Sequence, residues 1–406
     1  KSFGRTQPIL AFERWLIRSC LEKDRKKYGT LRHPTKSILD PLLPANDWTD
    51  NGLIYDLKRA SLTEDQAKSV ASSLTEKAIE YRVKLTQSQS SFKVYLKKHK
   101  HSYDVGLAGT KKIYKIGHKH YLKLQTLFKR TKGAQTGDSN KFIEILYTLL
   151  GRYQALSGHG FQAAVNERAF SVLHQYLNVT FECFASPLNC FFSNYCSVFS
   201  DVDSYFGSSG SFFSLPTDGS IQGSFEANPP FVSEVMTAMY DHMKKMLDNA
   251  EKRKLPLSFI IFIPGWVDEP CWKQAASSKF KRSHFVIAKD DHGFCDGAQH
   301  QRYDRYRESP FDTGIFVLQT SLGNKYWPPS KAFEAELRLS MAEAHPTESA
   351  KHRRAVAGRG VTDLDGAGGV YKGKKKDRNK QKSVEFRRKQ ERKKKRKTRK
   401  TREIVV

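Results

Sequence analysis

The chain has 406 residues, a formal net charge of +28 and a hydrophobic content of 38%. This length allows about two domains with appendages, and a mean hydropathy of -0.61 predicts that part of the chain is not packed. The basic balance indicates an anionic partner, with nucleic acid as the leading candidate. No apolar run reaches about 18 residues, which excludes a helical membrane span.

The six cysteines form no CxxC pair and no Cys/His set at zinc spacing. The sequence therefore predicts no metal site and no disulfide framework. Reduced thiols in an intracellular protein fit this pattern best.

The first third of the chain is expected to be helical. Five residues fall on one helical face: Ile9, Phe12, Trp15, Leu16 and Ser19. Ser61 and Glu64 have the spacing of a capping box ahead of a second helix. Residues 93–130 interleave Lys, His and Tyr, which is typical of a solvated helical surface, with contact to RNA phosphates as the alternative. We therefore expect an α-helical domain that supports RNA binding over residues 1–135.

From residue 136 onward, helices and short apolar strands alternate. Strands are expected at 179–185, 220–227, 257–264, 283–288 and 313–319. A helix is expected over 186–199, and another after Pro230, where four of the five Met residues share one apolar stripe. The alternation predicts a doubly wound, Rossmann-like α/β domain over residues 136–345, with ligands bound beyond the carboxyl ends of strands.

The last part of the chain, residues 346–406, is rich in Gly and charge. Residues 372–402 alone contain 19 Lys or Arg and three Asp or Glu, a net +16, which leaves +12 for the rest. So little apolar content cannot bury a core, and we expect a disordered tail. A basic run of this kind is typical of a nuclear-import signal or an RNA-binding arm, and nuclear localisation is expected.

Asn228, Pro229, Pro230 and Phe231 directly follow the expected strand 220–227. The prolines have no N–H and fix φ, so they end the strand in a rigid corner. In such a corner the Asn228 side-chain oxygen and the Pro229 carbonyl can accept the two hydrogens of an amine on a base, while Phe231 stacks on that base. The pattern predicts methylation of a base amine, and a plain strand stop is the alternative.

The segment CFASPLNC, residues 183–190, ends the first strand of the α/β region. Ala185 and Ser186 are small enough for close approach of a nucleotide, and Asn189 can bind the amino-acid part of a methyl donor. Asp203 lies where a carboxylate commonly binds ribose hydroxyls. For the segment 183–190, an N-capped helix start is an equally good interpretation. For Asp203, an ordinary Asx turn is an equally good interpretation.

Several ungapped blocks in the same order resemble the phosphorylated-CTD-interacting-factor family of cap-specific adenosine N6-methyltransferases. These blocks are the run from His174 to Gly207, GSFEANPPF, PLSFIIFIPGW, SKFKRSHFVI and GAQH, with HKHYLKLQTLFKR and GRYQAL further upstream. The resemblance implies a Rossmann-like class I methyltransferase that uses S-adenosylmethionine and no metal. The implied reaction is N6-methylation of the first transcribed, 2′-O-methylated adenosine beside the 7-methylguanosine cap of mRNA.

The resemblance also assigns roles to residues. The implied catalytic residues are Asn228, Pro229, Pro230 and Phe231. The implied donor-pocket residues are Gln162, Ala185, Ser186, Pro187, Asn189, Asp203 and Asn228. The implied substrate contacts are Phe231, Trp266, Lys281 and Arg282.

The chain departs from the family in three places. The family's WW domain, which reads the phosphorylated C-terminal domain of RNA polymerase II, is not recognised in this sequence and is expected either upstream or not at all, so that partner is expected only where the domain is present. Gly265 stands where an acid is expected, and the basic tail differs from the family's Ser-rich end. Two other functions stay open: N6-methylation of adenine in DNA or internal RNA, and an inactive scaffold that binds RNA or the polymerase tail.

Overall fold

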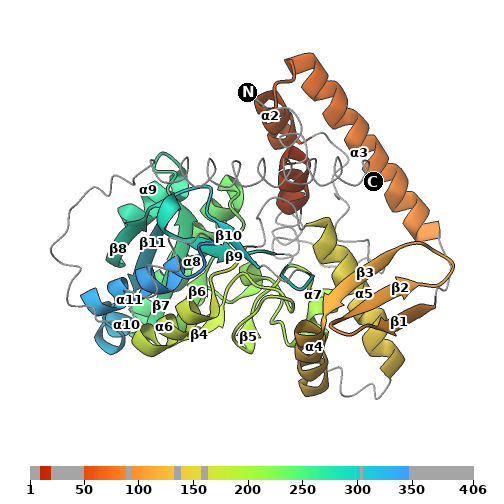
Figure 1. The fold of residues 1–406 in the computed structure, drawn as a ribbon. Coiled ribbons are helices and arrows are strands. Elements are labelled where there is room, and N and C mark those ends of the chain that lie inside the picture. Colours follow the sequence, from red (N-terminus) through yellow and green to blue (C-terminus); the bar gives the residue numbers. More distant parts are fainter. Residues whose placement is uncertain are drawn as a thin grey trace, which may run out of the picture. The chain divides into compact units, whose positions relative to one another are not determined.

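The computed structural model describes residues 10–19, 50–87, 93–131, 139–156, 163–297, 299–301 and 305–346 (Figure 1). All of them belong to one compact unit. Gln162 and residues 347–406, which hold nearly all of the predicted basic tail, lie outside the described residues. The domain limits at 135/136 and 345/346 stay predictions.

A six-stranded sheet with the order β5-β4-β6-β7-β11-β8 forms the centre of the α/β region (Figure 1). Its strands are β4 Val179–Glu182, β5 Asn194–Tyr195, β6 Gly223–Ala227, β7 Leu257–Pro264, β8 Lys281–Ile287 and β11 Thr313–Gln319. β4 is parallel to β5 and β6, and β6 is parallel to β7, whereas β11 is antiparallel to both of its neighbours. This mixed sheet confirms the predicted α/β class and places the carboxyl ends of β4 and β6 side by side.

Helices cover both faces of this sheet. They are α6 Glu167–Leu177, α8 Ser233–Lys252, α9 Pro270–Ala276, α10 Ser321–Tyr326 and α11 Lys331–Ala342. Because strand side chains alternate in direction, β7 is buried on both faces: Phe259 packs in the core beneath α8 and α9, and Ile260 packs in the core beneath α6 and α11. The predicted Met stripe of α8 is buried in the first of these cores, as expected.

The predicted helix over residues 186–199 is wrong. Residues 187–189 make a turn, and the short strand β5 follows. The cause is local: the backbone N–H groups of Phe191 and Phe192 both donate to the carboxylate of Glu182, so they are not available to an α-helical ladder.

The prediction of helix throughout residues 93–130 is also wrong. An antiparallel sheet of β1 Val94–Lys98, β2 Ser102–Leu107 and β3 Ile113–Gly117 precedes α4 His118–Arg130. Its buried residues alternate, as in Tyr103 and Val105 or Tyr114 and Ile116, and they share a core with α4 and with α5 Ser139–Ala155. Buried residues that alternate with exposed Lys and His along the chain indicate a half-buried strand.

Three helices precede this sheet: one over residues 10–19, then α2 Asn51–Arg59 and α3 Glu64–Gln87. Small and aromatic side chains, including Ala11, Trp15 and Ala67, join them in a separate core. The reciprocal cap of α3 is made by Thr63 and Gln66, two residues after the predicted pair Ser61 and Glu64. None of the described helices is both long and apolar enough to cross a membrane.

Two buried carboxyl groups face each other across the parallel pair β4 and β6. Glu182 and Glu226 are register partners, and each is 2% exposed. Burial raises the pKa of Glu182 from 4.5 to about 7 and raises the pKa of Glu226 well above its ordinary value, with the neighbouring Glu182 adding to the latter. Both acids therefore keep their protons to a higher pH in the folded protein than in the unfolded chain.

The substitution Glu182→Gln tests this burial. Between the unfolded and folded pKa values the folded chain binds more protons, so wild-type stability falls as pH rises through this window. Gln keeps the acceptor for the Phe191 and Phe192 N–H groups but does not titrate. We expect the melting temperature of the variant, relative to wild type, to rise from pH 5 to pH 8.

Thermal melts at several pH values measure this difference, with Glu76→Gln, on the exposed face of α3, as the control for the loss of a carboxylate. A difference between Glu182→Gln and wild type that stays constant with pH would show that Glu182 does not titrate in this range.

Candidate active site

The Asn-Pro-Pro-Phe corner begins where β6 ends. Asn228 follows Ala227, and the chain turns at once, with the Val232 N–H donating to the Pro230 carbonyl at 2.7 Å. α8 then begins at Ser233. The two prolines confine the chain to this sharp exit and place the corner at the carboxyl edge of the sheet, as predicted.

A pocket of about 130 Å³ opens at this edge. Its lining comes from the corner, from the segment after β4, from the segment after β5, and from helices packed beside them. The lining residues are Ile17, Tyr153, Leu156, Ala163, Cys183, Phe184, Ala185, Ser186, Asn189, Ser197, Val198, Ser211, Phe212, Phe213, Asn228, Pro230 and Val235. The structure thus brings Ala185, Ser186, Asn189, Asn228 and Pro230 together, as the sequence predicted.

Asn228 is held in one orientation by a single hydrogen bond. Its Nδ2 donates to the backbone carbonyl of Ala163 at 2.9 Å, and the residue is 8% exposed. A carbonyl can only accept, so the amide nitrogen must face Ala163 and the oxygen must face away. Within the described chain no group donates to Asn228 Oδ1 or to the Pro229 carbonyl, so both remain acceptors for a ligand.

Phe231 lies among other rings. Its ring packs edge-on against Trp266, with centroids 6.5 Å apart, and against Phe294 at 6.3 Å. Trp266 in turn meets Phe311 edge-on at 5.1 Å. The predicted substrate contacts Phe231 and Trp266 are therefore neighbours, and Phe231 is partly buried rather than free to swing.

The segment 183–190 is closed on itself. Asn189 Oδ1 accepts from the Ser186 N–H at 2.7 Å and from the Ser186 hydroxyl at 2.9 Å, which wraps the turn around Pro187. No described group accepts from Asn189 Nδ2, which leaves this donor for a ligand. Asn189 therefore both builds the turn and lines the pocket.

Two charged residues that sequence reasoning missed hold the end of this segment. Lys123 of α4 donates from its ammonium group to the Cys190 carbonyl at 2.7 Å. Glu182 accepts from the next two N–H groups at 2.7 and 2.8 Å. The hydrogen bond from the Lys123 ammonium group is stronger than a neutral one, and one Glu182 oxygen accepts twice, so these two side chains fix the wall of the pocket. Periodicity alone could not reveal them, because their partners are backbone groups.

Asp203 lies behind the pocket wall. It is fully buried, and its Oδ2 accepts from the Tyr153 hydroxyl at 2.6 Å and from the Phe199 N–H at 3.2 Å. Burial raises its pKa to about 7, although the hydrogen bonds from Tyr153 and Ser197 oppose this. Asp203 is not among the pocket-lining residues, so the structure gives it the role of holding Tyr153, which does line the pocket, in place of the predicted contact with ribose.

Lys281 and Arg282 are not brought to this edge. β8 runs parallel to β7, because both are antiparallel to β11, and Lys281 at its start pairs with Leu318, whose other partner is Phe259 near the start of β7. Through β11 and β7, Lys281 is level with Phe225 and Ser283 is level with Glu226, so the two basic residues lie two to three residues short of the level of Asn228 and three strands away from β6. Neither residue lines the pocket, and their predicted contact with the cap or a phosphate of the substrate stays a prediction. Gln162 lies outside the described residues.

The sequence resembles curated proteins over a little more than half of its length. It is 35% identical over 240 residues to the Mus musculus protein named mRNA (2'-O-methyladenosine-N(6)-)-methyltransferase, which covers 57% of this chain and 33% of the mouse protein. The Homo sapiens protein of the same name is 34% identical over 245 residues, or 58% of this chain and 34% of the human protein. The chain thus spans about a third of the length of the curated relatives it matches.

A family model described as "Phosphorylated CTD interacting factor 1 WW domain" matches residues 123–297. That range begins within α4 and ends beyond β9 Gly293–Cys295, so it contains the segment 183–190 and the Asn228 corner. These matches confirm the resemblance seen in the sequence. The chain is similar to two proteins named mRNA (2'-O-methyladenosine-N(6)-)-methyltransferase, and the family match extends across both segments that carry the predicted chemistry.

Proposed function

We propose that this chain transfers a methyl group from S-adenosylmethionine to N6 of the first transcribed 2′-O-methyladenosine beside the 7-methylguanosine cap of mRNA. The observation that carries the proposal is the fixed Asn228 side chain. Its oxygen and the Pro229 carbonyl are two acceptors without a described donor, at the carboxyl edge where the pocket opens.

Two acceptors suit an exocyclic amine for a physical reason. The lone pair of N6 is delocalised into the adenine ring, and the –NH2 group is planar and a poor nucleophile. When both N–H bonds point at carbonyl oxygens, the nitrogen is drawn toward tetrahedral geometry and its lone pair becomes available. Because Pro229 and Pro230 fix the backbone, Asn228 and the Pro229 carbonyl need little reorganisation to hold the amine.

Phe231 is placed to stack on the face of the base. It follows the two acceptors directly, and the rings of Trp266 and Phe294 limit its rotation. A ring held in this way can stack on adenine and keep the amine in line with the acceptors. Positioning of this kind provides much of the rate enhancement when a bound electrophile is already in place.

The lining of the pocket supports a methyl donor as its ligand. Phe212, Val198 and Phe184 supply apolar surface for an adenine ring, and Ser197 and Asn189 supply polar groups for a ribose and an amino-acid moiety. S-adenosylmethionine, when bound, supplies a sulfonium methyl group as the electrophile. The residues of this chain would hold it beside Asn228, which lines the same pocket.

The choice of mRNA as substrate rests on the relatives, whose names specify 2'-O-methyladenosine in mRNA. The cap beside that nucleoside and a role for the phosphorylated polymerase tail rest on the family resemblance. The first nucleoside of a transcript need not be flipped from a duplex, which favours it over adenine in DNA. Localisation in the nucleus is part of the proposal, because residues 372–402 carry a net +16.

Asn228→Ala is expected to reduce turnover by at least about a hundredfold, as does the loss of one preorganised polar group elsewhere. Affinity for S-adenosylmethionine should change by less than about threefold, since the rest of the pocket is intact. Turnover is measured by mass spectrometry of digested RNA, and donor affinity by isothermal titration calorimetry. Asn194→Ala, an exposed site on β5, is the matched control. If Asn228→Ala kept turnover within a few-fold of wild type, Asn228 would not hold the amine.

Capped and uncapped RNAs that begin with 2′-O-methyladenosine separate the proposed substrate from its rivals. We expect N6-methylated product on the capped RNA at a rate at least about tenfold above the uncapped RNA. Equal rates on both RNAs would contradict the cap requirement. Product on an internal adenosine or on single-stranded DNA alone would assign a different substrate, and no product on any of them would favour a binding scaffold.

A further inference from the structure

The helix over residues 10–19 belongs to two cores at once. Ala11 and Trp15 pack with α2 and α3 in the N-terminal core. Leu16 and Ile17 pack in a different core, which includes Val235 from the start of α8. If this helix served only the N-terminal core, its second face would have no reason to be apolar and buried beside α8.

Ile17 also reaches the candidate active site. It lines the same pocket as Asn228, Pro230 and Val235, and it is 9% exposed. Residues 10–19 lie outside the range of the family match, which begins at residue 123. One wall of the pocket is therefore made by a segment about 200 positions away from the catalytic corner in sequence.

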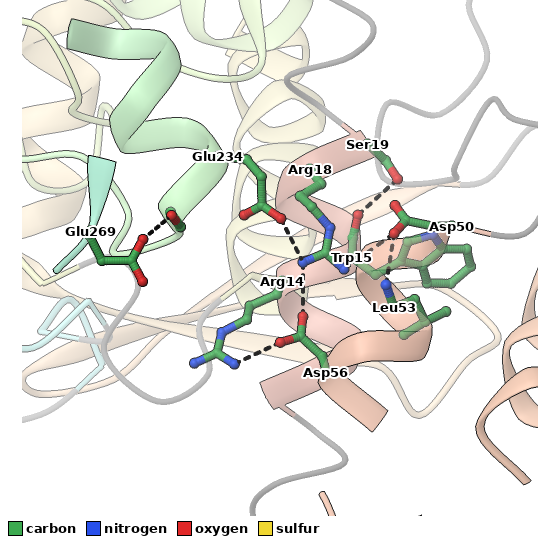
Figure 2. Close-up of polar contacts among 10 residues, drawn as sticks. Arg14, Trp15, Arg18, Ser19, Asp50, Leu53, Asp56, Glu234 and Glu269 are labelled. Atoms are coloured by element: carbon green, nitrogen blue, oxygen red, sulfur yellow. Dashed lines mark hydrogen bonds and ion pairs between the residues drawn. The ribbon is translucent and has the colours of Figure 1, made fainter. Parts of the chain in front are cut away.

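The next residue, Arg18, ties this helix to both of its neighbours (Figure 2). Its Nη1 donates to Asp56 Oδ2 of α2 at 2.8 Å and lies 3.8 Å from Glu234 Oε1 of α8. Its Nη2 lies 3.5 Å from Asp50, the N-cap of α2. Gly52 allows this close approach, since a Cβ at that position would lie 2.8 Å from the guanidinium carbon of Arg18.

Glu234 lies in the first turn of α8, three residues after Phe231. The residue before it, Ser233, donates its hydroxyl to Glu269, which is labelled in Figure 2. This turn therefore has a contact with Arg18 through Glu234 and another with Glu269 through Ser233. Arg14, one turn earlier on the N-terminal helix, donates to Asp56 at 3.0 Å and has no ion pair with α8 among the described residues. Of these two arginines, Arg18 is therefore the one with an ion pair to α8.

We propose that the helix over residues 10–19 forms part of the methyl-donor pocket. Ile17 contacts the bound donor, and the Arg18–Glu234 ion pair holds the helix against α8. The proposal rests on the proposed function for the identity of the ligand. Ile17 is a specificity-determining contact, and Arg18 is a positioning residue that acts through α8.

The test uses the full chain and S-adenosylhomocysteine as the probe, with affinity measured by isothermal titration calorimetry. Ile17→Trp, which puts a larger side chain into the pocket, should weaken binding by at least about tenfold, and Ile17→Val should stay within about threefold of wild type. Arg18→Leu should weaken binding several-fold. Arg14→Gln, which loses a contact with the same Asp56 but none with α8, should bind as wild type does.

A second measurement needs no ligand. Hydrogen exchange of backbone amides in the first turn of α8 should become faster in Arg18→Leu than in wild type or in Arg14→Gln. Melting temperatures of all variants show whether any loss of binding comes from global unfolding.

The outcomes separate the two proposals. Wild-type affinity in a folded Ile17→Trp variant would overturn the role of this helix and leave the proposed function intact. If the wild type bound neither S-adenosylhomocysteine nor S-adenosylmethionine, the proposed function would fail. The exchange data would then test the positioning role of the Arg18–Glu234 ion pair on their own. Unchanged exchange in the first turn of α8 in Arg18→Leu would overturn that role.

Discussion

Parallel pairing of β4 with β6 brings the carboxyl ends of two strands to one edge of the sheet. The candidate site depends on this arrangement. β4 delivers the closed turn around Pro187, and β6 delivers Asn228. The same pairing forces Glu182 and Glu226 to face each other in the interior. Neither acid can be well solvated there, and Glu182 uses its carboxyl oxygen to hold the backbone beyond the turn. Polar groups buried at this edge thus shape the pocket without lining it.

Much of the α/β region could be predicted from the sequence. β7 and β11 are continuous apolar runs between turn residues, and α8 carries a regular Met stripe, so burial and periodicity identify them. The corner at Asn228 could be predicted because prolines leave few backbone choices and the residue types match one chemistry. Its partner segment 183–190 was identified chiefly through the family resemblance.

Other parts could not be predicted, for reasons that lie in tertiary structure. The strands β1 to β3 bury only alternate residues, and their exposed Lys and His residues look like the surface of a helix. The turn after β4 depends on a carboxylate nine and ten residues before the N–H groups it accepts from. Positive charge predicts Lys281 as a substrate contact, but the strand order, which composition does not encode, puts it on β8, three strands away from β6. Ile17 lies off the helical face that the sequence predicts, so no sequence signal marked it.

The hydrogen bond between Asn228 and Ala163 also determines which amino acid this corner tolerates. An aspartate has the same shape as asparagine and offers an acceptor to the same amine. At position 228, however, it would turn an oxygen toward the Ala163 carbonyl, and two acceptors 2.9 Å apart repel unless a proton lies between them. The choice of the neutral amide at the end of β6 is therefore imposed by a backbone carbonyl 65 residues earlier in the chain. The grip on a ligand amine at this corner carries no charge of its own.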